Sequence, residues 1–254
     1  MTAVDAPQAV TGRETPDIET SSEAYARRFG GPVGAWFLEV QARTTLALLA
    51  RFPNASVLDV GGGHVQLTQA LVEAGHSVTV LGSDPVCATR LRRWRETGAV
   101  RFVAGDLIES PWLGEAFDVV LAFRLLPHVA RWPRLVAELS RLARAAIVVD
   151  YPTRRSLNAL AGAFFGWKKR IERDTRPFTV FRDSELKGAF AACGFRPWAR
   201  QPQFFWPMAL HRGLGAAGLS RALGRAASLL GLTRTLGSPV ILALERQLKS
   251  RQAR

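Results

Sequence analysis

The stretch SVLDVGGGHVQL, which runs from Ser56 to Leu67, decides the fold. Its first half is a short apolar run that predicts a buried strand. Three consecutive glycines, Gly61 to Gly63, end the strand signal, and a helical pattern follows them. Glycines in this position let a ligand approach the backbone closely, just before the N-terminus of a helix. The stretch therefore predicts a strand, a ligand-binding turn and a helix.

Strand and helix signals alternate along the rest of the chain. Strands are expected at 56–60, 77–81, 100–105, 117–123, 145–150, 195–200 and 239–245. Helices are expected at 65–75, 84–98, 132–143 and 183–194. This alternation predicts an α/β protein with a doubly wound, seven-stranded, mostly parallel sheet. Such sheets bind ligands beyond the carboxyl ends of their strands.

Length and composition favour a single domain. The chain has 254 residues, 48% of them hydrophobic, which is enough for one sizeable core. We expect a flexible leader at 1–22, without the apolar segment of a signal peptide, and one domain at 23–254. Cys87 and Cys193 do not have the spacing of a metal site, so we expect no metal and a cytoplasmic location. No apolar run reaches the roughly 18 residues that would span a bilayer, so the protein is expected to be soluble or peripheral at the membrane.

Positive charge is concentrated in the C-terminal part of the chain. Residues 1–150 carry 15 Lys and Arg against 16 Asp and Glu, whereas residues 151–254 carry 19 against 5. The two parts therefore have net charges of −1 and +14. Such an excess is typical of a region that meets nucleic acid, an anionic membrane or an acidic substrate. Arginines on solvated faces would give the same pattern.

The glycine turn does not have the pattern of a phosphate-binding loop. A dinucleotide fingerprint starting at Gly61 requires a third glycine at position 66, where the chain has Gln66. The Gly-Lys-Ser/Thr of a Walker loop is also absent. Asp59, two residues before the first glycine, would repel a phosphate and attract a cationic ligand. The turn therefore favours a positively charged ligand.

This pattern resembles motif I of the class I S-adenosylmethionine-dependent methyltransferases, D-x-G-x-G-x-G. Asp59, Gly61 and Gly63 match the motif, and Val65 replaces its last glycine. The resemblance follows the order of elements from about Tyr25 to Arg200. It implies a Rossmann-like fold, methyltransferase activity and S-adenosylmethionine as the donor. We expect Val65 to be the first helical residue, facing the sheet, so that its side chain leaves the donor site intact.

The resemblance also implies which residues bind the donor. Tyr25 and Arg28 resemble an N-terminal cover over its methionine end, and a solvated helix face is the alternative. Gly82 stands where the family has the acid for the ribose, so Asp84 either reaches the ribose or only caps its helix. Asp106 resembles the residue that contacts the adenine amino group, with a turn aspartate as the alternative. The donor-binding residues expected are Tyr25, Arg28, Asp59, Gly61, Gly62, Gly63, Ser83, Asp84, Asp106, Leu107 and Phe123.

Missing motifs limit the chemistry of the methyl acceptor. The tetrad that holds an amine, Asp/Asn-Pro-Pro-Tyr/Phe, is absent after the fourth strand, and so are carboxylates for magnesium. The two cysteines lie in apolar helical patterns and are poor candidates for a nucleophile. His128 is the candidate base for a hydroxyl acceptor, although it could equally pack after the strand. Arg124 and Tyr151 are expected to bind the acceptor. Transfer to oxygen or carbon is therefore favoured.

Two long insertions, at about 153–180 and 202–237, are apolar, aromatic and basic together. We expect them to form helical lids over the acceptor or to lie on an anionic membrane. The aromatic residues expected to bind the acceptor are Phe165, Trp167, Phe205 and Trp206. The favoured acceptor is an apolar small molecule that is lipid-, quinone- or polycyclic-like. The alternatives are an RNA methyltransferase that uses the basic C-terminal region and a non-catalytic protein that binds the donor.

Overall fold

The computed structural model describes residues 12–110, 114–157 and 178–247. The strands are β1 (Ser56–Val60), β2 (Ser77–Gly82), β3 (Val100–Ala104), β4 (Phe117–Ala122), β5 (Ala143–Tyr151), β6 (Phe195–Pro202) and β7 (Val240–Arg246). The helices are α1 (Asp17–Thr20), α2 (Glu23–Arg27), α3 (Gly31–Leu49), α4 (Thr68–Glu73), α5 (Arg92–Glu96), α6 (Trp132–Leu142), α8 (Asp183–Ala192), α9 (Met208–Leu214), α10 (Ala217–Leu229) and α11 (Leu232–Leu236). Short 3₁₀ turns are η1 (Gly62–His64), η2 (Pro85–Leu91) and η3 (Leu126–His128).

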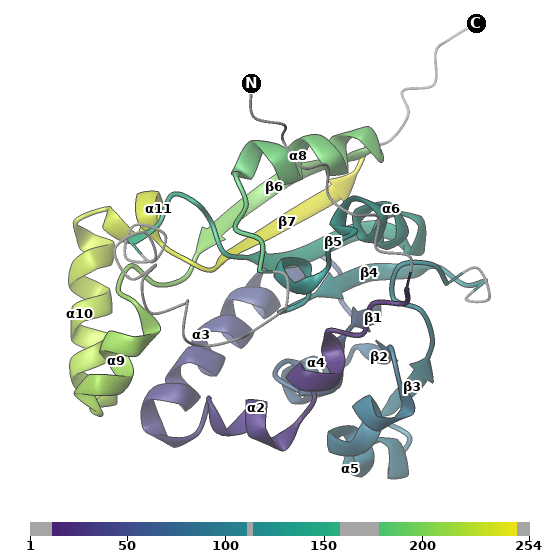
Figure 1. Ribbon diagram of the computed structural model, residues 1–254, viewed down its shortest axis with the longest axis horizontal. Coiled ribbons are helices and arrows are strands. Elements are labelled where there is room, and N and C mark those ends of the chain that lie inside the picture. Colours follow the sequence, from purple (N-terminus) through teal and green to yellow (C-terminus); the bar gives the residue numbers. More distant parts are fainter. Residues whose placement is uncertain (1–11, 111–113, 158–177, 248–254) are drawn as a thin grey trace, which may run out of the picture.

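The seven strands form one sheet in the order β3-β2-β1-β4-β5-β7-β6 (Figure 1). Strands β1 to β5 pair in parallel, and β7 runs antiparallel to both β5 and β6. The order reverses between β1 and β4, so the switch point at which such sheets bind ligands lies at the glycine turn. The predicted seven-stranded, mostly parallel sheet is confirmed.

Helices cover both faces of the sheet because the strands are apolar on both sides. One core joins β1, β4 and β5 to α6 and α8, through residues such as Leu139 and Phe190. The other core lies beneath α3 and α4, where Leu49 and Leu71 are fully or almost fully buried. This doubly wound packing leaves the carboxyl ends of β1 and β4 free to carry a site.

The predicted helix at 84–98 is divided. Asp84 caps the 3₁₀ turn η2 by accepting a hydrogen bond from Val86 N at 2.8 Å, and an α-helix forms only from Arg92 onward. The predicted helix at 65–75 begins later than expected, at Thr68. In both cases a 3₁₀ turn, η1 or η2, follows the strand, and the α-helix begins only after that turn.

The second predicted insertion, 202–237, contains α9, α10 and α11, which gather beside α3 at one edge of the molecule (Figure 1). Its Phe204 packs against Trp36 and Phe37 of α3, and the ring centroids are 5.3 and 4.6 Å apart. The insertion is therefore attached to the outside of α3. Most of the first insertion, including Phe165 and Trp167, lies outside the described residues.

The N-terminal segment corrects the expected leader. Residues from Gly12 onward pack on the domain, and Asp17, Thr20 and Ser21 are buried. We call Gly12–Ser21 the strap. Its composition is polar and resembles a leader, but Asp17 and Glu14 accept hydrogen bonds from backbone N–H groups of the domain. The ordered domain therefore starts before residue 23.

Candidate functional site

The glycine turn after β1 adopts a left-handed conformation at both of its ends. Gly61 has a φ of 74° and Val65 a φ of 57°. Val65 is therefore not the first residue of a helix, which corrects the sequence expectation. A left-handed backbone is costly for a β-branched residue, of the order of 1–2 kcal/mol. The glycine that the motif has at this position would relieve this backbone strain.

Asp59 lies beneath this turn and is completely buried. A Cβ at Gly62 would collide with its carboxylate, so the second glycine is required by Asp59 itself. Among the described residues, neither carboxylate oxygen has a hydrogen-bond partner. Burial raises the pKa of Asp59 from 3.8 to about 7. A buried carboxylate without a partner is expensive, and a nearby cation would offset that cost.

The strap crosses the carboxyl edge of the sheet directly over the turn. Asp17 accepts a hydrogen bond from Ser83 N at 2.7 Å, and Arg13 donates to the carbonyl oxygen of Ser83. Glu14, next to Arg13, accepts a hydrogen bond from Ala130 N at 2.6 Å. A Cβ at Gly63 would collide with Ser21 and with the backbone of Cys87. The strap thus covers the place where the sequence predicts the donor.

The other donor-binding candidates have local structural roles. Asp84 caps η2, as one of its two interpretations predicted. Asp106 accepts hydrogen bonds from Ile108 N and Glu109 N at 2.8 and 3.2 Å, which is the geometry of a turn aspartate. Leu107 and Phe123 are buried in the two cores. The contact of these residues with a donor remains a prediction.

A cavity of about 500 Å³ opens beside the turn, at the ends of β4 and β5. It brings together several predicted residues from distant parts of the chain. Its lining residues are Tyr25, Arg28, Arg124, Pro127, His128, Asp150, Pro152, Thr153, Ser156, Phe178, Val180, Met208, Ser238 and Pro239. We call this space the acceptor cavity. The glycines of the turn are not among the residues that line it.

Arg124 and Asp150 form the polar floor of the acceptor cavity. Asp150, at the end of β5, accepts a hydrogen bond from Arg124 N at 2.6 Å, and its other oxygen lies 3.5 Å from Arg124 Nε. Arg124 also donates to Gln41 Oε1 at 3.0 Å and has a φ of 57°. Burial raises the pKa of Asp150, whereas the Arg124 guanidinium lowers it. These contacts hold a strained arginine in one orientation.

Sequence reasoning missed Asp150 and selected its neighbour Tyr151. Tyr151 is fully buried, and its hydroxyl donates to Asp183 at 2.9 Å. This placement corrects the expectation that Tyr151 binds the acceptor. Neighbouring residues of a strand face opposite sides, and an acid at the end of a central strand was the available signal for Asp150.

His128 and Tyr25 lie on the walls of the acceptor cavity. His128 ends η3, and its ring centroid is 5.5 Å from that of Phe178. The charge of His128 also acts on Asp150 and lowers the pKa of that carboxyl. Tyr25 lies 5.2 Å from the Arg28 guanidinium, and Arg28 pairs with Glu19 at 3.1 Å. The structure thus places the candidate base and the predicted cover around one space.

Phe205 and Trp206 line a different cavity, between α3 and α10. The residues expected to bind the acceptor are therefore divided. Arg124 faces the acceptor cavity, Phe205 and Trp206 face the second one, and Phe165 and Trp167 lie outside the described residues.

The residues around the turn fit the donor of this methyltransferase class. S-adenosylmethionine carries a sulfonium and an ammonium group, and Asp59 supplies a buried carboxylate whose oxygens bond to none of the residues that the structure describes. Because Gly62 and Gly63 have no side chain, the turn can pack directly against Asp59 and Ser21. In the described part of the chain, no group of three His, Cys, Asp or Glu residues is placed to hold a metal ion.

Comparison with known proteins identifies the class to which this fold and site belong. Residues 36–200 match the methyltransferase domain family, and the chain is a member of it. The predicted class I S-adenosylmethionine-dependent methyltransferase family and its Rossmann-like fold are confirmed.

Individual relatives agree with this membership. The chain is 34% identical over 156 residues to the ubiquinone biosynthesis O-methyltransferase of Methylococcus capsulatus, with 58% of this chain and 63% of the relative covered. It is 30% identical over 139 residues to the malonyl-[acyl-carrier protein] O-methyltransferase of Pectobacterium atrosepticum, with 52% and 54% covered. The chain thus spans 54% to 63% of the length of these two relatives.

A solved structure shows the same fold over nearly the whole chain. Magnesium protoporphyrin IX methyltransferase from Synechocystis PCC 6803, with bound SAH, superposes with a TM-score of 0.62. The sequences are 15% identical, and the alignment covers 88% of this chain and 93% of the other.

Proposed function

We propose that the protein transfers a methyl group from S-adenosylmethionine to an apolar small molecule, most readily to a hydroxyl oxygen and otherwise to carbon. The observation that carries the proposal is the acceptor cavity, in which His128 and Asp150 lie among mainly apolar walls. A cavity of about 500 Å³ has the size of a small-molecule site. The two relatives, both named O-methyltransferases, support the choice of oxygen.

His128 has the chemistry for the acceptor side of the reaction. The donor, when bound, supplies a methyl group on a sulfur that leaves without needing a proton. The chain must therefore only orient the acceptor and remove its proton. His128 is half-buried on the cavity wall, and Asp150 lies close enough to stabilise a protonated imidazole. The pair would hold the proton taken from a hydroxyl group.

Apolar residues around this pair favour an apolar acceptor. Pro127, Val180 and Met208 line the cavity, and Phe178 is 53% exposed at its edge. Arg28 and Arg124 add positive charge, which suits the donor's carboxylate or an acidic phenol. The apolar lining of this cavity therefore favours a small apolar acceptor over a polynucleotide.

Methyl transfer from labelled S-adenosylmethionine to fractions of a cell extract tests the proposal. Label is expected in the apolar fraction, and His128→Gln is expected to lower kcat by about 10²-fold with donor affinity unchanged. Ser184→Ala, in the first turn of α8, is the matched control and should leave kcat unchanged. Label in RNA alone would replace this function by the RNA alternative. Label in no fraction would favour a non-catalytic donor-binding protein.

We also propose peripheral contact with an anionic membrane through the C-terminal end of α10. Leu229 and Leu230 are 89% and 75% exposed and adjacent. Arg234, on α11, places positive charge in the same region. Apolar side chains beside cations are typical of surfaces that meet anionic lipid. In the described residues, no helix is both long and apolar enough to cross a bilayer.

A further inference from the structure

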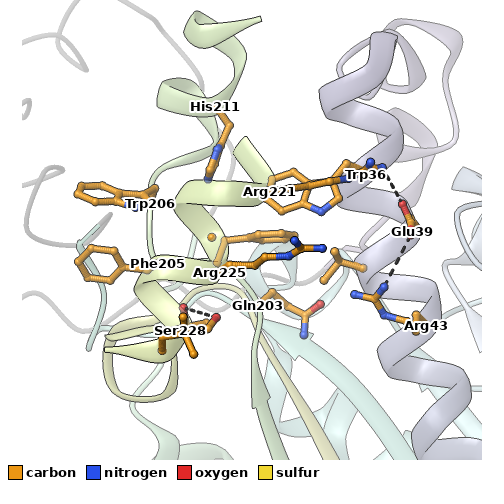
Figure 2. A pocket seen from close by; sticks show the side chains of 15 residues that line it. Trp36, Glu39, Arg43, Gln203, Phe205, Trp206, His211, Arg221, Arg225 and Ser228 are labelled. Atoms are coloured by element: carbon orange, nitrogen blue, oxygen red, sulfur yellow. Dashed lines mark hydrogen bonds and ion pairs between the residues drawn. The ribbon is translucent and has the colours of Figure 1, made fainter. Parts of the chain in front are cut away.

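A second cavity, of about 590 Å³, lies outside the acceptor cavity, between α3, α10 and the segment after β6. None of its lining residues lines the acceptor cavity. The residues around it are Trp36, Glu39, Val40, Arg43, Gln203, Phe204, Phe205, Trp206, His211, Arg221, Gly224, Arg225, Ser228, Leu229 and Thr233 (Figure 2). Its size is again that of a small-molecule site. The proposed methyl transfer does not use this space.

Aromatic rings form the walls of this cavity. Trp36 comes from α3, and Phe205 and Trp206 come from the segment after β6, where their ring centroids lie 4.8 Å apart. Phe205 and Trp206 are only half-buried, so each has a surface that remains available. Three large rings around one space provide packing for a flat ligand.

Three arginines contribute to the cavity, and one of them has no carboxylate partner. Glu39 is shared by Arg43, at 3.7 Å, and Arg221, at 3.3 Å. Arg225 extends from α10 into the space toward α3 (Figure 2) and pairs with no carboxylate in the described residues. The lining therefore has an excess of positive charge, which Arg225 presents to the cavity.

Two buried polar atoms of the lining also have no hydrogen-bond partner within the described part of the chain. They are His211 Nδ1 and Gln203 Oε1. His211 is 1% exposed, and its ring points into the space between Trp206 and Trp36 (Figure 2). Burial lowers the pKa of His211, so the ring is neutral near pH 7 and adds no charge. Buried polar atoms without partners are rare in folded proteins and mark places where a ligand can complete the hydrogen bonds.

We propose that this cavity is a second ligand site, which binds a planar aromatic anion that carries an N–H or O–H donor. The rings of Trp36, Phe205 and Trp206 enclose its flat body. Arg225 binds its anionic group, and the ligand donor bonds to Gln203 Oε1 or His211 Nδ1. A carboxylate, sulfonate or phosphate meets the same requirement at Arg225.

The fluorescent compound 1-anilinonaphthalene-8-sulfonate is a suitable probe, because it combines aromatic rings, a sulfonate and an N–H donor. Its binding to the full chain is measured by fluorescence titration with excess S-adenosylhomocysteine present. Arg225→Gln is expected to weaken its affinity about tenfold, because one charge-assisted hydrogen bond is lost. N-phenyl-1-naphthylamine lacks the sulfonate, and its affinity should change less than about twofold. The control Arg92→Gln, on the exposed side of α5, should alter neither affinity.

A second variant fills the cavity without disturbing the helix. A Cβ at Gly224 would make an ordinary contact with the Trp36 ring at 3.5 Å, and leucine is a better helix former than glycine. Gly224→Leu should therefore abolish binding of both probes while the thermal midpoint is retained. Phe178→Ala, in the acceptor cavity, should leave both affinities unchanged.

Wild-type affinity for the sulfonate probe in Arg225→Gln would overturn the proposal. Retained binding in Gly224→Leu would also overturn it. Loss of binding in Phe178→Ala, with Gly224→Leu unaffected, would assign the probe to the acceptor cavity and equally refute a second site.

Discussion

Asp59 is expected to destabilise the ligand-free protein at neutral pH, and Asp59→Asn should reveal by how much. The carboxyl is fully buried, has no hydrogen-bond partner in residues 12–110, 114–157 and 178–247, and has a pKa raised from 3.8 to about 7. The unfolded chain releases this proton near pH 4, whereas the folded chain keeps it until about pH 7. In that window the folded state binds more protons, so stability falls as pH rises. The full shift corresponds to about 4 kcal/mol.

The measurement compares the urea unfolding free energies of the wild type and Asp59→Asn at about pH 4.5 and about pH 8. Between these conditions, the difference in free energy of unfolding between the two proteins should grow by about 3 kcal/mol in favour of the variant. The change with pH does not depend on the cost of burying the amide, which is the same at both values. Asp118→Asn, at a half-exposed carboxyl of β4 whose pKa is lowered by Ser56, is the control. Because that pKa lies below 3.8, the carboxyl is largely ionised in both the folded and the unfolded chain over this pH range, and the stability difference of this variant should stay nearly constant.

The affinity for the donor should also depend on the Asp59 carboxylate. The variant lacks the buried charge, so its affinity for S-adenosylmethionine, measured by calorimetry at pH 8, should fall at least tenfold. A stability difference that stays constant from acid to neutral pH would refute the reasoning about burial. A variant that is stabilised but binds the donor as tightly as the wild type would show that Asp59 serves the fold alone.

Two further predictions concern the strap and the end of α10. Asp17→Ala removes the acceptor of Ser83 N, so S-adenosylhomocysteine should bind and dissociate about tenfold faster in stopped-flow experiments. Unchanged rate constants would show that the strap lies outside the path of the donor. The double variant Leu229→Ser and Leu230→Ser should bind anionic vesicles more weakly in sedimentation assays, and wild-type binding should fall as salt is added. Binding that the double variant retains, or that neutral vesicles share, would contradict contact through α10.

The sheet could be predicted from the sequence because each strand is marked by a short apolar run between turn signals. All seven expected strands are present, and β1 to β5 pair in parallel as the alternation with helices requires, whereas β7 runs antiparallel to its two neighbours. The helices were less predictable where they begin. Asp84 and Pro85 gave a correct capping signal, but the backbone that follows is a 3₁₀ turn, which has the same caps.

The strap and the floor of the acceptor cavity could not be predicted in the same way. In the sequence, Asp17 and Glu14 look like residues of a polar leader. Their positions are set by hydrogen bonds from Ser83 N and Ala130 N, which are distant in the sequence. The orientation of the Asp150 carboxylate depends on Arg124, 26 positions away in the sequence, whose backbone N–H donates a hydrogen bond to it. Contacts of this kind leave no local periodicity, so a single sequence does not reveal them.

Backbone strain is concentrated where the proposed chemistry would occur. In the described residues, only Asn54, Val65 and Arg124 have a positive φ without being glycine. Val65 follows β1 and Arg124 follows β4, the two central strands between which the order of the sheet reverses. Each such residue costs of the order of 1–2 kcal/mol, and the fold must hold it by other contacts. For Arg124 those contacts are Asp150 and Gln41, which fix its guanidinium beside the acceptor cavity before any ligand arrives. Val65, in place of the motif's last glycine, and Arg124 thus both place a left-handed backbone next to the switch point of the sheet.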